Sequence, residues 1–385
     1  MSHLFYLSSK HLFHLNNNRS VAISCQAITH YKQNLKSIQR RSEWKTTGTG
    51  AQFMGVANLH EAEEEPVFPS SMVVTDEQNI IYSARLDDGT AIYTKSLNDL
   101  EGAEGLILRK PNFIVHDIDY DRHNKRLVLS ANHNYDYTSH LCLLPIEQNR
   151  IQPLTEGDCI DANPVFDPQN SNRIIYDSCG LGYDNRGDIL NGPKEICVLD
   201  LQTGQIESVV NDAQYDFFKP LKDLQGNLYF IRRPYKSQNS SILGDLKALI
   251  ISPLKILNAV TGWLDYFTRR YAGETLKTSS GANPAKAKQK SEEELFIEGN
   301  LIKTQQAKKQ NKDAGEKYPG IIPNSWQLMK QTPQGELICV KKGVLSYMLQ
   351  NEDVIYSNGQ QLIKINSGAE ETMLAEGELI HKINA

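Results

Sequence analysis

The sequence predicts an all-β fold, a six-bladed β-propeller, and the first observation behind this is a repeat. The apolar triplets IIY, LVL and IIY begin at Ile80, Leu127 and Ile174, 47 residues apart in both intervals. A strand-like segment and a polar turn come before each triplet, and two further strand-like segments follow it, with apolar and polar residues alternating at a period of two. Four short strands in a unit of about 40 to 50 residues are typical of one propeller blade.

The other blades follow from the same pattern. Residues 217–235 supply two strands of blade five, whose partners come later, in residues 325–343, and blade six follows in residues 344–377. The N-terminal hairpin, residues 4–18, lacks an innermost strand, whereas residues 379–384 have no blade of their own. We therefore predict that the C-terminal strand completes the N-terminal blade and closes the ring, which leaves only short, protected sheet edges. Seven blades would result if the two chain ends formed separate blades.

The whole chain, residues 1–385, is predicted to be a single propeller with two interruptions. Residues 26–69 are expected to form a helix and a Gly-rich connector between blades one and two. Apolar residues recur there every three or four positions, at Ile28, Tyr31, Leu35 and Ile38. Residues 236–322 are expected to form a helical and partly disordered insertion in blade five.

The glycines of the connector raise the question of a phosphate-binding loop. Gly50 and Gly55 have the spacing of a P-loop, but Val56 and Ala57 stand where that motif requires Lys and then Ser or Thr. A dinucleotide-binding fingerprint fails as well, because Phe53 stands where its third glycine would fall. We interpret the stretch as a structural crossing beyond a helix end, with a backbone nest for an anion as the alternative.

Composition limits the function and the compartment. Hydrophobic residues make up 39% of the chain, enough for a core, and the net charge of −5 gives no general attraction to nucleic acid. The six cysteines form no C-x-x-C pair, so we interpret them as buried free thiols of a cytoplasmic protein. No secretory signal is recognised at the N-terminus, and no run of about 18 apolar residues would span a membrane.

The first half of the insertion carries the strongest helical signal in the chain. Apolar residues follow steps of three and four and form a wide stripe, and we predict that these are partner-binding residues: Leu246, Ile250, Leu257, Val260, Trp263, Leu264 and Phe267. The stripe would pack against the side of the propeller, against a partner protein, or on a membrane surface with basic residues near the interface. Residues 275–291 are expected to be a mobile loop, residues 294–304 a strand or strand pair that rejoins blade five, and residues 307–320 a flexible turn.

The first strand of every blade surrounds the central channel of a propeller, so polar residues on those strands converge there. The candidates are His116, Asp117, Asp161, Asp216 and Lys219, together with Arg232, which lies on a second strand and would reach one rim. A cation or a small polar ligand would bind at such a place, and a solvated channel lining is the alternative. His133, Asp136 and His140 form a loose set of possible metal ligands on a loop, which is too weak a pattern to predict a metal site. No cofactor is predicted.

One blade carries a family pattern. Its residues Asp161, Pro164, Phe166, Pro168, Ile174, Tyr176 and Ser178 match D-x-x-P-x-F-S-P-D-G-x-x-I-x-F-x-S, so the chain resembles TolB-like six-bladed propellers, although the Asp-Gly turn is replaced. A looser resemblance is to bacterial propeller proteins that accompany a MoxR-type ATPase and a von Willebrand factor A-type protein. There is no G-x-S-x-G elbow of an attached hydrolase.

The function that follows is binding. We predict a non-enzymatic scaffold that uses the propeller face and the insertion helix to bind another protein, in the cytoplasm or peripherally at the inner face of the membrane. An enzyme of the lactonase or glycoside-cleaving propeller type, with a cation in the channel, is the alternative.

Overall fold

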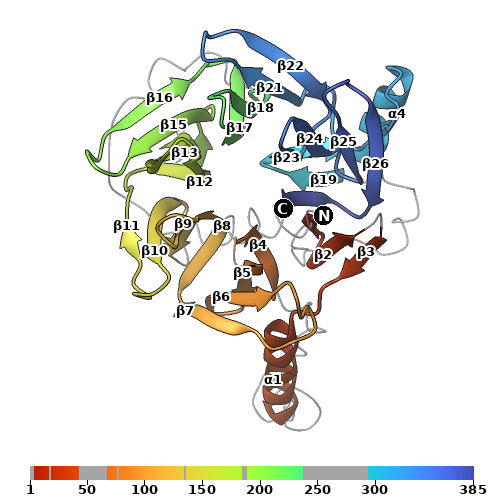
Figure 1. The fold of residues 1–385 in the computed structure, drawn as a ribbon. Coiled ribbons are helices and arrows are strands. Elements are labelled where there is room, and N and C mark those ends of the chain that lie inside the picture. The colour runs from red at the N-terminus through yellow and green to blue at the C-terminus, as the bar shows by residue number, and fades with distance from the viewer. Residues whose placement is uncertain are drawn as a thin grey trace.

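The computed structural model describes residues 4–16, 19–42, 67–75, 78–133, 136–183, 189–236 and 294–385. Six antiparallel sheets stand around a central axis like the blades of a propeller (Figure 1). The predicted all-β, six-bladed fold is therefore confirmed. The triplets at Ile80, Leu127 and Ile174 all belong to the second strand of a blade, which explains their equal spacing.

Each blade is given from its innermost strand outward. Blade one consists of β27 (Ile380–Asn384), β1 (Leu4–Ser8), β2 (His11–Asn16) and β3 (Arg19–Ala22). Blade two consists of β4 (Phe68–Val74), β5 (Asn79–Leu86), β6 (Gly89–Ser96) and β7 (Gly105–Pro111). Blade three consists of β8 (Phe113–Asp121), β9 (Arg126–His133), β10 (His140–Pro145) and β11 (Gln152–Pro153). Blade four consists of β12 (Cys159–Asp167), β13 (Asn170–Tyr183), β15 (Glu195–Asp200) and β16 (Ile206–Val210), and β14 (Ile189–Asn191) pairs with β13. Blade five consists of β17 (Tyr215–Lys222), β18 (Leu228–Pro234), β21 (Gln327–Gln331) and β22 (Leu337–Lys342). Blade six consists of β23 (Ser346–Gln350), β24 (Asp353–Ser357), β25 (Gln361–Ile365) and β26 (Glu371–Glu376).

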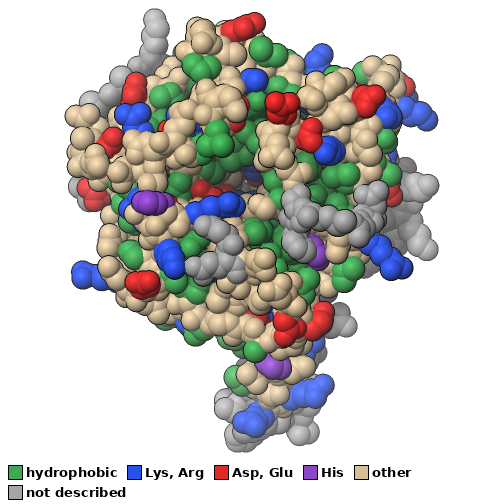
Figure 2. All heavy atoms as spheres, viewed as in Figure 1, with side chains coloured by type: hydrophobic (Ala, Val, Ile, Leu, Met, Phe, Trp, Pro, Cys, Tyr) green, Lys and Arg blue, Asp and Glu red, His purple; other side chains and the backbone are tan. Residues whose placement is uncertain are grey.

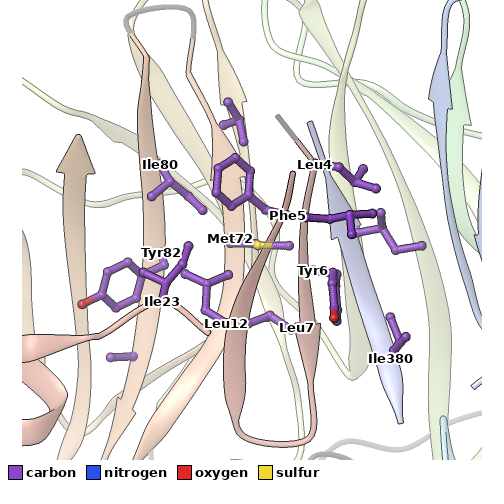
Figure 3. Packing of buried hydrophobic residues seen from close by; sticks show 14 of the residues in the cluster. Leu4, Phe5, Tyr6, Leu7, Leu12, Ile23, Met72, Ile80, Tyr82 and Ile380 are labelled. Carbon is purple, nitrogen blue, oxygen red and sulfur yellow. The ribbon is translucent and has the colours of Figure 1, made fainter. Parts of the chain in front are cut away.

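The ring is closed by the two chain ends. Strand β27 pairs antiparallel with β1, with Tyr6 opposite Ile383 and Leu7 opposite Lys382, and the termini lie close together near the axis (Figure 1). The predicted closure is confirmed, and the seven-bladed alternative is wrong because both ends share one blade. Figure 3 shows Ile380 of the closing strand near Tyr6 in the apolar cluster that joins blades six, one and two.

The hydrophobic core is divided among the junctions between neighbouring blades. One cluster joins blades two and three around Val115 and Leu129, and another joins blades four and five around Ile175 and Phe230. Since each sheet has apolar side chains on both faces, it packs against the blade before it and the blade after it. Central polar groups are thus supported by a rigid wall.

Blade five is interrupted as the sequence predicts. Strands β17 and β18 pair with β21 and β22 to complete one four-stranded sheet, although β21 begins at Gln327. The strand pair predicted in residues 294–304 exists as β19 (Glu294–Ile297) and β20 (Asn300–Lys303), but it forms a separate two-stranded sheet and does not rejoin blade five. Instead, its apolar side chains Ile297 and Ile302 enter the core between blades five and six.

The flexible turn predicted for residues 307–320 is wrong. Helix α4 (Thr304–Asp313) occupies its first part, and Ala307 is buried in the same core cluster as Ile302. The side-chain amide of Asn311 donates hydrogen bonds of 2.8 Å to the carbonyl oxygens of Gly320 and Ile322. Those contacts are made with residues beyond the helix, so the polar local sequence did not reveal them.

Helix α1 (Gln26–Ser42) follows blade one and projects from the ring (Figure 1). Its beginning is attached to blade two, because the Ala27 N–H donates to Glu104 Oε2 at 2.8 Å and Glu104 also pairs with the buried Lys95. The Gly-rich connector with Gly48, Gly50 and Gly55 lies outside the described residues.

Two further expectations concern thiols and membranes. The six cysteines are free, but only Cys142, Cys179 and Cys197 are buried, and Cys339 is exposed on the outermost strand of blade five. Within the described part of the chain, no helix combines the length and the apolar character needed to cross a membrane.

Candidate functional site in the central channel

The six innermost strands surround a cavity of about 270 Å³ on the axis of the ring. A hollow is visible at the centre of the molecule in Figure 2. Among the described residues, four basic and two acidic side chains line this cavity: Arg122, Lys219, Lys222, Lys382, Asp117 and Asp119. We call this cavity and these residues the channel site.

Backbone irregularities place the lining side chains. The register between first and second strand shifts in blades two to five, at Pro69/Ser71, Val115/Asp117, Ala162/Val165 and Phe218/Leu221. A bulge re-aims the side chains that follow it. In blades four and five it includes a left-handed residue followed by proline, Asn163 (φ 49°) with Pro164 and Lys219 (φ 53°) with Pro220.

Asp117 connects three blades. Its carboxylate accepts a hydrogen bond from the hydroxyl of Ser71 on blade two and pairs with Lys382 on the closing strand of blade one. Lys382 therefore links the closing strand of blade one to blade three. The charge pair couples ring closure to the wall of the cavity.

Asp119 lies two residues further along β8 and has a different environment. Its carboxylate accepts a 2.8 Å hydrogen bond from the Phe166 N–H of blade four. Desolvation outweighs this bond and the nearby Lys382 charge, and raises the pKa of Asp119 to about 6. The channel site thus contains one carboxyl group that titrates near neutral pH.

Lys219 lies where blades five, six and one meet. Its ammonium donates to the carbonyl oxygens of Leu345 at 3.0 Å and His381 at 3.3 Å, and it is 3.1 Å from Glu298 Oε1 at the turn of the β19–β20 hairpin. Burial and the neighbouring lysines lower the pKa of His381 to about 4, so its imidazole is neutral at pH 7. The hairpin of the insertion therefore contacts the channel wall directly.

A buried carboxylate behind the cavity joins blades four and five. Asp177 is fully buried, accepts hydrogen bonds from the Asn163 side-chain amide at 2.5 Å and the Lys219 N–H at 3.1 Å, and pairs with Lys194 at 2.9 Å. It holds both left-handed residues in place. Asp177 was not among the predicted channel residues because it lies on a second strand.

The predicted channel residues divide into two groups. Asp117 and Lys219 line the cavity. The lining does not include His116, which bonds Asn132 at 2.8 Å, or Asp216, which forms a buried pair with Arg233 at 2.9 Å. Arg232 lies over the Tyr215 ring and donates to Gln327, and Asp161 lies at the junction of blades three and four.

Residues of the closing strand were missed. Lys382 and Asn384 line the cavity, and the Asn384 side chain accepts a 2.9 Å hydrogen bond from the Val74 N–H. Applying the first-strand rule to residues 379–384 would have found both, because these residues were already predicted to be an innermost strand.

The other predicted sites have mixed outcomes. Leu246, Ile250, Leu257, Val260, Trp263, Leu264 and Phe267 lie outside the described residues, as does the expected mobile loop. His133 packs edge-on against Phe113, whereas His140 lies beside Cys159 and Asp161. The structure therefore groups His140 with Cys159 and Asp161 as a candidate metal cluster, and not with His133 and Asp136.

Comparisons with known proteins identify structures of similar fold. The chain matches no protein-family model and no curated protein sequence. TolB from Acinetobacter baumannii is similar in structure, with a TM-score of 0.50 and 10% identity over 99% of this chain and 66% of that chain. The structure of a nidogen/laminin complex has a TM-score of 0.50 and 6% identity over 99% and 97%. The tricorn protease aligns at a TM-score of 0.39 and 10% identity, over 96% of this chain and 38% of that one. At these identities the likeness establishes the fold alone, that of a six-bladed β-propeller.

Proposed function

We propose that this propeller is a non-enzymatic scaffold that binds an acidic segment of a partner protein at the channel site. The observation that carries the proposal is the excess of basic over acidic side chains around a cavity built by all six blades. Charge complementarity of this kind guides association and selects partners.

The acidic side chains of the channel site support a binding role because they brace the ring. Asp117 is engaged by Ser71 and Lys382, and Asp119 by the Phe166 N–H. Arg122 is exposed at the edge of the cavity. A rigid, charged cavity with an exposed arginine suits a carboxylate-bearing chain segment.

The first experiment locates the contact. A photo-crosslinking residue in place of Tyr120, which lines the cavity, should attach covalently to a specific partner in an extract of the native host. The same residue in place of Leu106, exposed on β7 of blade two, is the matched control and should not. Equal cross-linking at both positions would contradict the proposal.

The second experiment tests the charge. Arg122→Glu should weaken capture of the partner identified above by about 10-fold or more, and raised salt should weaken wild-type binding. Arg150→Glu makes the same charge change at an exposed position outside the cavity lining and should have little effect. If neither substitution changed binding, the partner would bind outside the channel site.

Asp117 and Asp119 favour one alternative, an enzyme of the lactonase or glycoside-cleaving type with a cation in the channel. Both carboxylates line the cavity, and a carboxyl group with a pKa near 6 suits general acid catalysis. Hydrolysis that Asp119→Asn abolishes, together with a stoichiometric cation that the same substitution removes, would favour this alternative.

Partner identity and compartment stay predictions. The looser family resemblance suggests a MoxR-type ATPase or a von Willebrand factor A-type protein as the partner, and the predicted insertion helix as a second contact. The location is predicted to be cytoplasmic. Contact with the inner face of the membrane is tested by flotation with anionic vesicles, where absence of binding would contradict that contact.

A further inference from the structure

Three side chains of metal-ligand type meet at the junction of blades three and four, away from the channel site. They are His140, the first residue of β10, and Cys159 and Asp161 near the start of β12. Their ligand atoms all lie within 4.8 Å of one another. His140 Nδ1 is 3.9 Å from Cys159 Sγ and 3.9 Å from Asp161 Oδ2.

The backbone imposes this meeting. Ser139 and Ile160 form a parallel bridge between the two blades, in which the Ser139 N–H donates to the Cys159 carbonyl oxygen at 3.1 Å and the Asp161 N–H donates to the Ser139 carbonyl oxygen at 2.8 Å. Successive side chains of a strand point to opposite faces. Cys159 and Asp161 therefore share one face of β12, opposite to Ile160, and His140 joins them because it follows Ser139.

Hydroxyl groups orient the carboxylate. Thr155 donates to Asp161 Oδ2 at 2.5 Å and Ser178 donates to Asp161 Oδ1 at 2.7 Å, while Thr155 itself accepts from the Leu141 N–H at 2.9 Å. Each carboxylate oxygen can accept more than one interaction, so Oδ2 keeps a position that faces His140. Outer partners of this kind are what hold a ligating carboxylate in metal sites.

The cluster is built into the fold and open on one side. Asp161 is 2% exposed, whereas Cys159 is half-buried and 24% of the His140 side chain is exposed. An ion could enter from the His140 side and keep contact with solvent there.

We propose that His140, Cys159 and Asp161 bind a zinc ion through one nitrogen, one sulfur and one oxygen, with a fourth position open to water or another ligand. Zinc accepts this mixture of ligands in a tetrahedral arrangement. Ligand atoms in such an arrangement are about 3.5 Å apart, so modest side-chain movements from the present separations would complete the site. The site is separate from the channel, where the enzymatic alternative would place its cation.

The test begins with the full chain stripped by a chelator. Titration calorimetry with zinc chloride should show one zinc per chain, and cobalt should give the absorption of a sulfur-to-cobalt bond. Cys159→Ser should remove that absorption and weaken zinc binding by about 100-fold or more, and His140→Gln should also weaken it strongly.

The control is Cys339→Ser, which removes an exposed thiol on blade five and should leave zinc affinity and the cobalt spectrum unchanged. Circular dichroism shows whether each variant folds, and zinc should raise the Tm of wild type but not of Cys159→Ser. Failure of folded wild-type protein to bind zinc, or equal binding by wild type and Cys159→Ser, would overturn the proposal.

Discussion

Blades four and five share an inner-strand backbone and differ in what surrounds it. Asn163 and Lys219 occupy equivalent bulges in their two blades, both have a left-handed conformation, and both precede proline. The strands of blade four follow one another along the chain, whereas the third strand of blade five begins only at Gln327, after the insertion. Its sheet nevertheless completes with the same strand order. Strand pairing, and not continuity of the chain, makes the blade.

The side chains beside the bulge differ sharply. In blade four, Ala162 lies opposite Asp177, a buried carboxylate with three partners. In blade five the equivalent pair is Phe218 and Ile231, and Phe218 packs in a cluster with Ile302 of the insertion. Beside the bulge, blade four therefore has a buried charge, whereas blade five has apolar contact with the inserted chain. The comparison indicates that buried side chains of inserted residues 294–322 contribute to the core of the ring.

The largest expected effect is on the blade-four side. Asp177→Ala removes the countercharge of Lys194 and the acceptor of the Lys219 N–H, so the free energy of unfolding should fall by about 3–5 kcal/mol. Denaturant unfolding measures it. Glu207→Ala, on the exposed outermost strand of blade four, should change stability by less than about 0.5 kcal/mol. A small loss in Asp177→Ala would show that the buried charge is not what joins the two blades.

A smaller expected effect concerns the pH dependence of stability, to which Asp119 and His381 contribute with opposite signs. Asp119, bonded to blade four, has a pKa raised to about 6, so the folded state binds a proton more readily than the unfolded state and stability rises as pH falls through 6. His381, beside Lys219 of blade five, has a pKa lowered to about 4, so the unfolded state is protonated first and stability falls as pH drops below 6.5. In wild type the two changes largely cancel.

Single substitutions of Asp119 and His381 should separate their two contributions to the pH dependence of stability. The stability at pH 5 minus that at pH 7 should decrease by about 1 kcal/mol in Asp119→Asn and increase by about 2 kcal/mol in His381→Gln, each relative to wild type. Denaturant unfolding at both pH values gives these differences. Shifts of the same sign in the two variants would contradict the assignment.

Much of the fold was predictable from sequence because strand alternation and the repeat are local signals. Ile80, Leu127 and Ile174 marked three second strands, and residues 379–384 were identified as the closing strand by elimination. Helix α4 was missed because its sequence is polar and its buried Asn311 finds partners at Gly320 and Ile322, which only folding brings near.

The candidate site was less predictable for a related reason. Asp117 and Lys219 could be placed because each lies on an innermost strand, but the importance of Lys382 depends on a contact with Asp117 across another blade. Likewise, Cys159 reads as an ordinary thiol until the Ser139–Ile160 bridge brings His140 to it. Such pairings between blades leave no pattern in a single sequence.

The most direct test of the account compares two neighbouring residues of the β19–β20 hairpin. Ile302 is 4% exposed within the core cluster of blades five and six, whereas Leu301 is 56% exposed. If the hairpin belongs to the core, Ile302→Ala should lower the free energy of unfolding by about 2–5 kcal/mol and Leu301→Ala by less than about 0.5 kcal/mol. Equal, small losses in the two variants would show that the hairpin only rests on the ring, and would contradict the account.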